Sequence, residues 1–307
     1  MRVLVTGGAG FIGGHVALSL AERGYEVVVL DNLERSSPLL LTRLREAGLP
    51  VLVGDVRSFH DYGGYDVVVH AAAYIDVAES VEKPVEYLEN NAVATARVAK
   101  ACAESGALMV YMSSAAVYGE PESLPLREDH PTRPISPYGL SKLVGEQVLH
   151  VFAKTYGLRY VALRLFNVYG PGQSTAYAGV VSRFVERAAR GLPPVIYGDG
   201  LQTRDFVHVR DVARAVHLSV EQGVSNEVFN IATGRPTTIL ELARLVCRLA
   251  GVEAEPIFER PRPGDIKHSY ADISKATSLL GYRPAVSLEE GLKELLDLHR
   301  SARGVTG

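Results

Sequence analysis

Two side chains that can share a proton lie four residues apart near the middle of the chain. Tyr138 and Lys142 follow Ser136 and Pro137, which suit the N-cap and first position of a helix, so both side chains lie on one helical face. A free tyrosine ionises at about pH 10, and lowering its pKa to neutrality requires about 4 kcal/mol. An ammonium group roughly 5 Å away supplies about 3 kcal/mol at an effective dielectric constant of about 20. The pair predicts a general base that needs one more positive charge; the alternative is a polar helix face exposed to water.

A second candidate group is a hydroxyl from Ser113 or Ser114. These serines stand at the end of a predicted strand, and ligands of open α/β sheets bind beyond the carboxyl ends of the strands. A serine there can hydrogen-bond a reacting oxygen and pass its proton to Tyr138. Either serine could instead cap a helix or turn.

The start of the chain carries a glycine-rich turn. A predicted strand runs into Gly7-Gly8-Ala9-Gly10-Phe11-Ile12-Gly13, and a predicted helix follows. Glycines allow a tight turn and the close approach of a pyrophosphate, which the helix N-terminus attracts. Asp31 ends the second predicted strand 21 residues beyond Gly10, close to the roughly 20 expected of a carboxylate that binds the adenosine ribose. The pattern predicts NAD rather than NADP, although Arg35 stands nearby and Asp31 could instead cap its strand.

Two further strand ends belong to the same predicted site. Asp55-Val56 follows the third strand, where a carboxylate could bind the adenine amino group. His70-Ala71-Ala72 ends the fourth, where small side chains let a cofactor approach the backbone. Taken alone, His70 is more typical of a packed histidine at a strand end than of a cofactor contact. No cluster of histidines, cysteines and carboxylates has metal-ligand spacing, so we expect no metal.

Composition narrows the class of protein. The 307 residues are 47% hydrophobic and 22% charged, and 32 Lys and Arg against 35 Asp and Glu leave a net charge of −3. We therefore expect no nucleic-acid partner, and without an apolar run of roughly 18 residues we expect no membrane partner. Cys102 and Cys247 are too few for a disulfide framework. Together with a first strand that leaves no room for a signal peptide, they predict a cytoplasmic protein.

Short β-branched runs alternate with helical stretches in the first half of the chain, which predicts a doubly wound α/β (Rossmann) fold with a parallel sheet. The predicted strands are 2–6, 26–31, 50–53, 66–70, 108–113 and 159–165, and the predicted helices are 11–23, 39–47, 84–105 and 137–156. After Gly170 prolines interrupt the chain, and helices are predicted near 180–190, 239–250 and 288–300. We expect an NAD-binding domain over 1–170, to which 205–233 returns, and a smaller C-terminal α+β substrate-binding lobe over 171–307.

Several motifs occur together in an order typical of one enzyme family. They are GxxGxxG with Asp31, His70-Ala-Ala, Asn90-Asn91, Ser113-Ser-Ala-Ala-Val-Tyr-Gly119, Tyr138-x-x-x-Lys142, Leu163-Arg-Leu-Phe-Asn-Val-Tyr-Gly-Pro-Gly172, Arg204-Asp-Phe-Val-His-Val209 and Arg262-Pro-Gly-Asp265. Over essentially its whole length the chain resembles the extended short-chain dehydrogenases/reductases. The resemblance implies NAD as cofactor, a UDP-sugar substrate, and epimerisation at C4 of a UDP-hexose (UDP-galactose/UDP-glucose) through a transient 4-keto sugar.

The resemblance also implies roles for individual residues. Ser114, Tyr138 and Lys142 are the implied catalytic residues, with the tyrosine as general base and the lysine on the nicotinamide ribose. The implied cofactor contacts are Gly7, Gly10, Phe11, Ile12, Gly13, Asp31, Asn32, Asp55, Val56, His70, Ala71, Ala72, Asn90, Tyr138, Lys142 and Phe166. The implied substrate contacts are Ser114, Asn167, Val180, Tyr197, Arg204, Arg262 and Asp265, with the two arginines on the diphosphate and the tyrosine near the uracil.

Relatives of the same fold leave alternatives open. Dehydratases that resemble the chain carry Asp-Glu after the active-site hydroxyl and decarboxylases keep a glutamate, whereas Ala115-Ala116 stands here and favours epimerisation. A 4-keto reductase would use NADPH, and non-catalytic NAD-binding regulators often lack the tyrosine or the lysine. Ser269 stands where some relatives carry tyrosine, so N-acetylated sugars could fit, and Ile75 replaces a lysine that contacts phosphate. The resemblance further implies a homodimer formed through 84–105 and 137–156.

Overall fold

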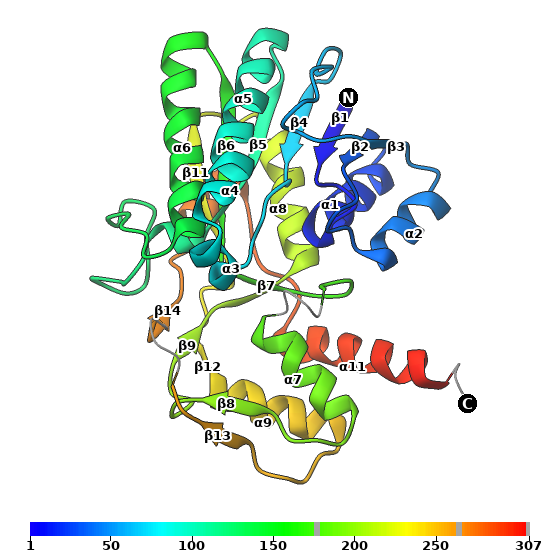
Figure 1. Ribbon diagram of the computed structural model, residues 1–307, viewed down its shortest axis with the longest axis vertical. Helices are drawn as coiled ribbons and strands as arrows, with labels where there is room; N and C mark the ends of the chain where they lie inside the picture. Colours follow the sequence, from blue (N-terminus) through cyan, green and yellow to red (C-terminus); the bar gives the residue numbers. More distant parts are fainter. Residues whose placement is uncertain (175–178, 262–265, 305–307) are drawn as a thin grey trace.

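Seven parallel strands form the central sheet in the part of the chain that the structure describes, residues 1–174, 179–261 and 266–304 (Figure 1). The structure is a computed structural model. The strand order is β11-β6-β5-β4-β1-β2-β3, and the connection reverses direction at β1, between β2 and β4. The strands are β1 (Arg2–Thr6), β2 (Glu26–Asp31), β3 (Val51–Val53), β4 (Val67–His70), β5 (Leu108–Ser114), β6 (Arg159–Leu165) and β11 (Glu227–Ile231). Reversal points of this kind are where doubly wound sheets bind ligands.

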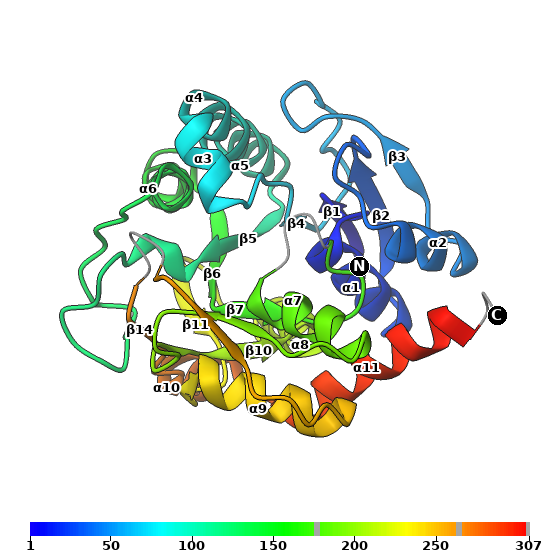
Figure 2. The same ribbon diagram turned by 60° about the horizontal axis from the view of Figure 1, so that its bottom comes forward.

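Helices cover both faces of this sheet (Figure 2). On one face α1 (Phe11–Glu22), α2 (Pro38–Glu46) and α8 (Val209–Glu221) pack over a core that includes Val5. On the other, α5 (Ala94–Ser105) and α6 (Pro137–Tyr156) pack over a core that includes Leu4. Neighbouring residues of a strand point to opposite faces, so a strand covered on both sides must be apolar throughout. The doubly wound fold predicted from such runs is confirmed.

Element bounds in the first half agree with the sequence-based prediction to within one residue, with one exception. The stretch predicted as one helix over 84–105 consists of α4 (Pro84–Tyr87), a π-helical turn η1 (Leu88–Val93) and α5. Such turns occur frequently at functional sites. Periodicity also does not predict α3 (Val77–Glu82), which has only 6 residues.

The π-helical turn brings two asparagines into the interior. Asn90 and Asn91 are buried, and the Asn91 carboxamide accepts the Tyr74 N–H and donates to the Tyr74 carbonyl, at 2.8 Å each. The same amide nitrogen donates to the Ser141 hydroxyl of α6 at 3.0 Å. The turn therefore ties the loop after β4 to α6.

A smaller lobe lies below the carboxyl ends of the sheet strands (Figure 1). Its core is formed by side chains such as Phe184, Leu242 and Leu296. The remaining elements are η2 (Ala115–Val117), β7 (Asn167–Tyr169), α7 (Val180–Ala189), β8 (Val195–Tyr197), β9 (Thr203–Arg204), β10 (Phe206–His208), β12 (Thr237–Thr238), α9 (Ile239–Ala250), β13 (Ile257–Glu259), β14 (His268–Ser269), α10 (Ser274–Leu280) and α11 (Leu288–Gly304). β11 pairs with β6 in the main sheet; the division at residue 170 stays an interpretation. Across the described residues, none of the helices has the length and apolarity to cross a membrane.

A substitution at Phe229 of β11 tests whether this strand, which comes late in the sequence, packs into the core of the main sheet. Its side chain is fully buried, whereas Phe258 of β13 is 52% exposed. We expect Phe229→Ala to lower the free energy of unfolding by about 3–5 kcal/mol, because it leaves a cavity. The matched variant Phe258→Ala should lower it by less than about 1 kcal/mol. Urea unfolding followed by circular dichroism measures both, and equal losses would contradict the placement of β11.

Candidate active site

The glycine-rich turn forms a cradle beyond β1. Gly7 has a φ of +65°, and a Cβ there would lie 2.6 Å from the Cα atom of Ala72. Gly10 is the N-cap of α1 and gives its first turn no side-chain cap, which leaves N–H groups for a phosphate. The predicted contacts that line this cofactor pocket are Gly7, Gly10, Phe11, Ile12, Gly13, Asp31, Asn32, Asp55, Val56, Ala71, Ala72 and Asn90. A side chain at Gly7 would collide with the Ala72 backbone, so glycine is needed for this tight turn, and the free N–H groups of α1 fit the pyrophosphate of NAD.

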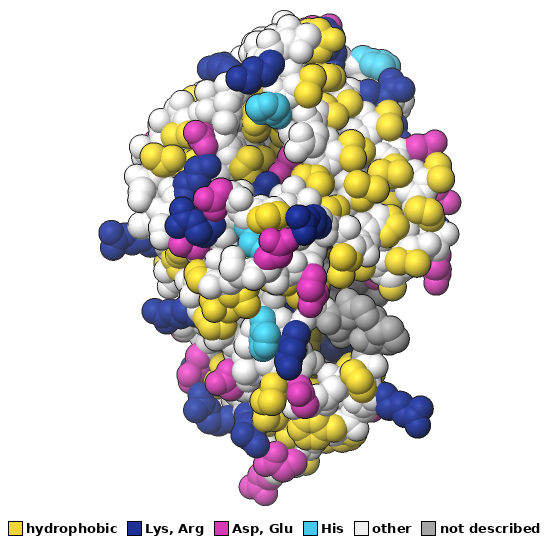
Figure 3. Space-filling view, turned by 90° about the vertical axis from the view of Figure 1, so that its left-hand side faces the viewer, with side chains coloured by type: hydrophobic (Ala, Val, Ile, Leu, Met, Phe, Trp, Pro, Cys, Tyr) yellow, Lys and Arg dark blue, Asp and Glu magenta, His cyan; other side chains and the backbone are white. Residues whose placement is uncertain are grey.

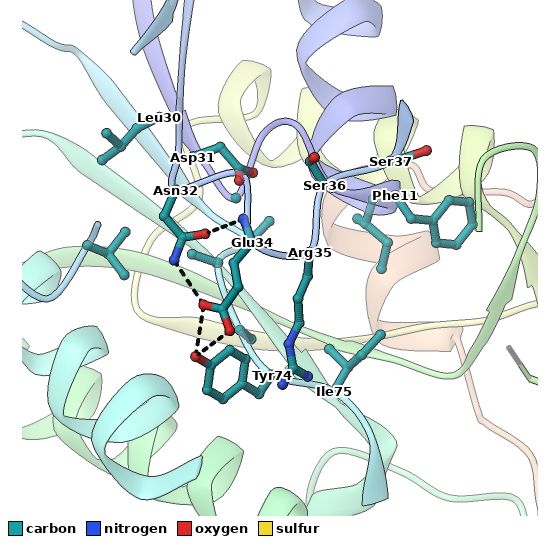
Figure 4. A pocket seen from close by; sticks show the side chains of 18 of the residues that line it. Phe11, Leu30, Asp31, Asn32, Glu34, Arg35, Ser36, Ser37, Tyr74 and Ile75 are labelled. Carbon is teal, nitrogen blue, oxygen red and sulfur yellow. Dashed lines mark hydrogen bonds between the residues drawn. The ribbon is translucent and has the colours of Figure 1, made fainter. Parts of the chain in front are cut away.

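Asp31 closes the cofactor pocket at the end of β2 (Figure 4). Its carboxylate accepts the N–H groups of Ala9 at 2.9 Å and Leu33 at 2.8 Å. Burial raises the pKa of Asp31, and these backbone hydrogen bonds lower it. Each oxygen keeps lone-pair capacity for a ribose hydroxyl. The strand-end role and the predicted ribose contact are therefore compatible.

Asp55 lies beside Asn32 at the same end of the pocket. The Asn32 amide donates to Asp55 at 3.3 Å, and the Arg57 guanidinium donates to it at 2.6 Å. The hydrogen bond from Arg57 is the main reason that the pKa of Asp55 is lowered to about 2. The carboxylate is ionised at neutral pH and can accept a hydrogen bond from an adenine amino group.

His70 at the end of β4 is packed inside the protein. Both ring nitrogens are engaged inside the protein, Nδ1 with the Thr6 hydroxyl at 2.7 Å and Nε2 with the Thr95 hydroxyl at 3.0 Å. Burial lowers the pKa of His70 to about 3, so the ring is neutral. The side chain is a packed strand-end histidine, and its contact with the cofactor stays a prediction, whereas Ala71 and Ala72 beyond it line the pocket.

Tyr138 and Ser114 meet where α6 begins and β5 ends. Ser136 caps α6, and its hydroxyl accepts the Gly139 N–H at 3.0 Å, as the sequence predicts. Burial raises the pKa of Tyr138, and a hydrogen bond with Ser114 lowers it. The direction of the shift agrees with the expectation that a neighbouring lysine does not suffice to ionise this tyrosine.

The structure distinguishes the two candidate serines. Ser113 is buried and donates to Glu146 at 2.5 Å, inside the core. Ser114 caps η2 by accepting the Ala116 N–H at 3.2 Å, and its hydroxyl lowers the pKa of the nearby Tyr138. Ser114 is therefore the hydroxyl placed beside the tyrosine, and its capping role exists alongside that contact.

Lys142 is buried one helical turn beyond the tyrosine, with 3% of its surface exposed. Its ammonium donates to the Met112 carbonyl at 2.8 Å and lies 5.1 Å from the centre of the Tyr111 ring. Burial lowers the pKa of Lys142 to about 7, and Glu146, one turn further along α6, acts to raise it. Glu146 itself is paired with buried Arg164 at 2.7 Å. The inner strand β5 thus holds the Lys142 ammonium in place, although burial of its positive charge is unfavourable.

A second pocket lies between α7 and the small sheets of the lower lobe. The predicted substrate contacts that line it are Asn167, Val180, Tyr197 and Arg204. Arg262 and Asp265 lie outside the described residues. Three arginines that the sequence-based prediction does not include also line this substrate pocket: Arg183 and Arg187 of α7, and Arg190, the C-cap residue of that helix. Their spacing, which places them on one helical face, is the signal that could have found them.

Two further predictions concern the rest of the site. Phe166 lies in a core cluster with Tyr118 and Leu126, and its contact with the cofactor stays a prediction. Among the residues that the structure describes, no group of three or more histidines, cysteines and carboxylates could hold a metal ion.

Comparison with known proteins agrees with this geometry. The sequence profile of the NAD dependent epimerase/dehydratase family matches residues 3–232. The chain belongs to this family. A UDP-glucose 4-epimerase of Azospirillum brasilense is 36% identical over 332 residues, which cover 100% of this chain and 94% of the relative. The cofactor of this chain is NAD, and the chain is an extended short-chain dehydrogenase/reductase, as its motifs imply.

Solved structures of this epimerase family superpose over nearly the whole chain. A Thermotoga maritima UDP-glucose 4-epimerase with UDP-glucose has a TM-score of 0.93 and 39% identity, and covers 99% of this chain and 100% of its own. A Methanobrevibacter ruminantium UDP-N-acetylglucosamine 4-epimerase with UDP-N-acetylmuramic acid has a TM-score of 0.92 and 36% identity, and covers 98% of each chain. Structures with different UDP-sugars are thus similar to this epimerase-family enzyme to nearly the same degree.

Burial of Lys142 should lower the stability of this epimerase-family enzyme at neutral pH. The pKa is about 7 in the folded chain and about 10.4 in the unfolded one, so the unfolded state binds more protons between these values and stability rises with pH there. We expect Lys142→Met to raise the free energy of unfolding of the cofactor-free protein at pH 7 by roughly 2–4 kcal/mol. The gain should shrink toward pH 10.

Denaturant unfolding across this pH range measures the effect. Lys154→Met, at an exposed lysine of the same helix, is the matched control and should change little. A Lys142→Met variant that is less stable than the parent at pH 7 would contradict the conclusion that burial of the Lys142 charge destabilises the folded protein. A difference in stability that does not vary with pH would contradict it too.

Proposed function

We propose that the protein interconverts UDP-galactose and UDP-glucose by inverting C4 of the hexose. The observation that carries the proposal is that Tyr138 lies near enough to Ser114, at the carboxyl end of β5, for the serine hydroxyl to lower the pKa of the tyrosine. β5 lies between β4 and β6; Ala71 after β4 lines the cofactor pocket, and Asn167 after β6 lines the substrate pocket. This order of the strands supports the proposal that the hydroxyl pair acts between the cofactor and the sugar.

Each catalytic residue has one task in this reaction. Tyr138 takes the proton of the C4 hydroxyl, directly or through Ser114, which hydrogen-bonds the same oxygen. Lys142 binds the nicotinamide ribose and, when protonated, favours the phenolate. NAD⁺, when bound, supplies the acceptor that takes up the C4 hydrogen with its electron pair and returns it. Arg204 holds the diphosphate, so that the keto sugar can turn while its nucleotide stays anchored.

The residues after the hydroxyl favour epimerisation over elimination. η2 places Ala115 and Ala116 directly after Ser114, and neither alanine can act as an acid or base. A dehydratase needs such a pair to remove water across C5 and C6. Without an acid and a base after Ser114, elimination across C5 and C6 is not favoured, and the 4-keto sugar instead takes its hydrogen back at C4.

A second substrate class is the UDP-N-acetylhexosamines. Ser269 of β14 pairs with Arg204 of β9 in register, and Arg204 lines the substrate pocket. A side chain as small as serine leaves space for a 2-acetamido group. The similarity to a UDP-N-acetylglucosamine 4-epimerase supports this second candidate.

Activity assays with a matched pair of tyrosine variants test the proposal. We expect the parent protein to convert UDP-galactose to UDP-glucose without added reductant, and Tyr138→Phe to lower kcat by about 10³-fold or more while the fold is kept. Tyr156→Phe, at a 48% exposed tyrosine of the same helix, should keep full activity. Full activity in Tyr138→Phe would contradict the assigned base. Conversion of UDP-N-acetylgalactosamine but not UDP-galactose would replace the first substrate by the second.

We further propose a cytoplasmic location and a role in galactose metabolism. Cys102 and Cys247 are buried free thiols, as is usual in a reducing compartment. Burial raises the pKa of the Cys102 thiol to about 12, which keeps it protonated and unreactive.

We propose that two copies of the chain pair through α6 and the segment 84–105, which comprises α4, η1 and α5. Figure 3 shows hydrophobic side chains on the side of the molecule that α6 occupies in Figure 1. Leu140 and Val151 of α6 are 42% and 52% exposed, and Val93, just before α5, is 49% exposed. Apolar side chains that share one helical surface are typical of an interface.

A charge introduced into this surface tests the homodimer. We expect Val151→Glu to halve the mass measured by light scattering, because a carboxylate would be buried without a partner. Val53→Glu, at a 71% exposed valine of β3 on the other edge of the sheet, should leave the mass unchanged. A monomeric parent protein would contradict the proposal.

A further inference from the structure

Arg35 is the residue of the cofactor pocket whose chemistry argues for NADP. It lies four residues beyond Asp31 and lines the same pocket. In dinucleotide-binding folds, a nearby arginine accommodates the 2′-phosphate that distinguishes NADP from NAD. The preference for NAD or NADP therefore depends on the direction in which the Arg35 guanidinium points.

The structure places that guanidinium in a two-pronged ion pair with α3. Nη1 and Nη2 of Arg35 donate to the two carboxylate oxygens of Glu79 at 2.8 and 2.9 Å. The guanidinium carbon lies 4.0 Å from the centre of the Tyr74 ring, and the two paired side chains are 21% and 19% exposed. Bidentate geometry, stacking on an aromatic ring and partial removal from water each strengthen such a pair.

Glu79 is itself fixed by several contacts. It accepts the Tyr87 hydroxyl at 2.8 Å and the Lys83 ammonium at 3.4 Å. Its backbone N–H donates to the side chain of Asp76, the N-cap of α3, at 2.8 Å. Arg35 is the main reason that the pKa of Glu79 is lowered to about 2, so the carboxylate is ionised at neutral pH. The acceptor that holds Arg35 is therefore both rigid and charged.

The surroundings at the ribose end are acidic (Figure 4). Asp31, Glu34 and Asp55 line this part of the pocket. The Glu34 carboxylate bonds the Tyr74 hydroxyl at 3.2 Å, and the nearby Arg57 is paired with Asp55 at 2.6 Å. Both arginines at this end are thus bound to carboxylates, and a 2′-phosphate would meet negative charge.

We propose that Glu79 is a specificity-determining residue that enforces NAD over NADP by holding the Arg35 guanidinium away from the adenosine ribose. The residue lies on a helix outside the glycine-rich turn and acts through a second residue. Removing the carboxylate releases the guanidinium, which can then turn to a 2′-phosphate. The inference concerns the cofactor and does not depend on which UDP-sugar the enzyme uses.

Competition between the two cofactors tests the inference directly. Purified protein, freed of nucleotide with charcoal, is equilibrated with NAD⁺ and NADP⁺ together, separated from free nucleotide and denatured, and the released cofactors are quantified by chromatography. We expect Glu79→Ala to raise the ratio of bound NADP⁺ to NAD⁺ about tenfold, as one new charge-assisted contact would. Glu79→Gln should raise it less, because the amide can still accept one hydrogen bond.

Three control variants isolate the role of Arg35. The ratio should be unchanged in Arg35→Ala, because the paired guanidinium does not contribute to NADP⁺ binding. It should return to the parent value in the double variant Arg35→Ala/Glu79→Ala. Lys83→Ala removes the other cation on Glu79 without releasing Arg35 and should also leave the ratio unchanged.

Two outcomes would overturn the inference. One is a parent-like ratio in both Glu79 variants, with thermal melting showing that they are folded. The other is a raised ratio that persists in the double variant, which would assign the gain to loss of negative charge alone. If Glu79→Ala does not fold, Glu79→Gln, which keeps a partner for the Tyr87 hydroxyl, decides between the same two outcomes.

Discussion

The buried charge of Lys142 is the constraint on which the active site depends. α6 must approach β5 closely enough for the ammonium to bond a strand carbonyl. Glycine makes this approach possible at position 145, where a Cβ would meet the Tyr111 side chain. Close packing removes the lysine from water and lowers its pKa, and it also brings Tyr138 against Ser114. The close packing of α6 on β5 therefore has two effects. It makes the charge of Lys142 energetically unfavourable, and it brings together Tyr138 and Ser114, which transfer the proton.

The fold could be predicted wherever a segment carries its own signal. The bounds of α6 follow from Ser136 at its start and Gly157, which has a φ of +70°, at its end, and both act locally. Strands covered on both faces are apolar throughout, so they stand out in the sequence. The π-helical turn Leu88–Val93 depends instead on hydrogen bonds of Asn91 to the loop after β4. No local pattern specifies such contacts, and the sequence predicts one continuous helix there.

The site shows the same division between local and distant determinants. Motif spacing alone predicts that the glycine-rich turn, Asp31, Tyr138 and Lys142 belong to one site. It cannot distinguish a ligand contact from a satisfied core residue at His70, because the decision lies with hydroxyls of other elements. It also cannot show that Arg35 is paired with a carboxylate 44 residues away. Two determinants thus set the choice between NAD and NADP: Asp31, which the motif spacing identifies, and the pairing of Arg35 with Glu79, which only the folded structure shows.

Reversible oxidation at a single carbon is the central claim, and the isotope at that carbon tests it most directly. UDP-galactose carrying deuterium at C4 is incubated with the purified protein in ordinary water, and the UDP-glucose formed is analysed by mass spectrometry and NMR. Removal and return of one hydrogen within a closed site predicts that the deuterium is kept at C4 in the product. Loss of the label to water, or a product that has lost water across C5 and C6, would contradict the claim.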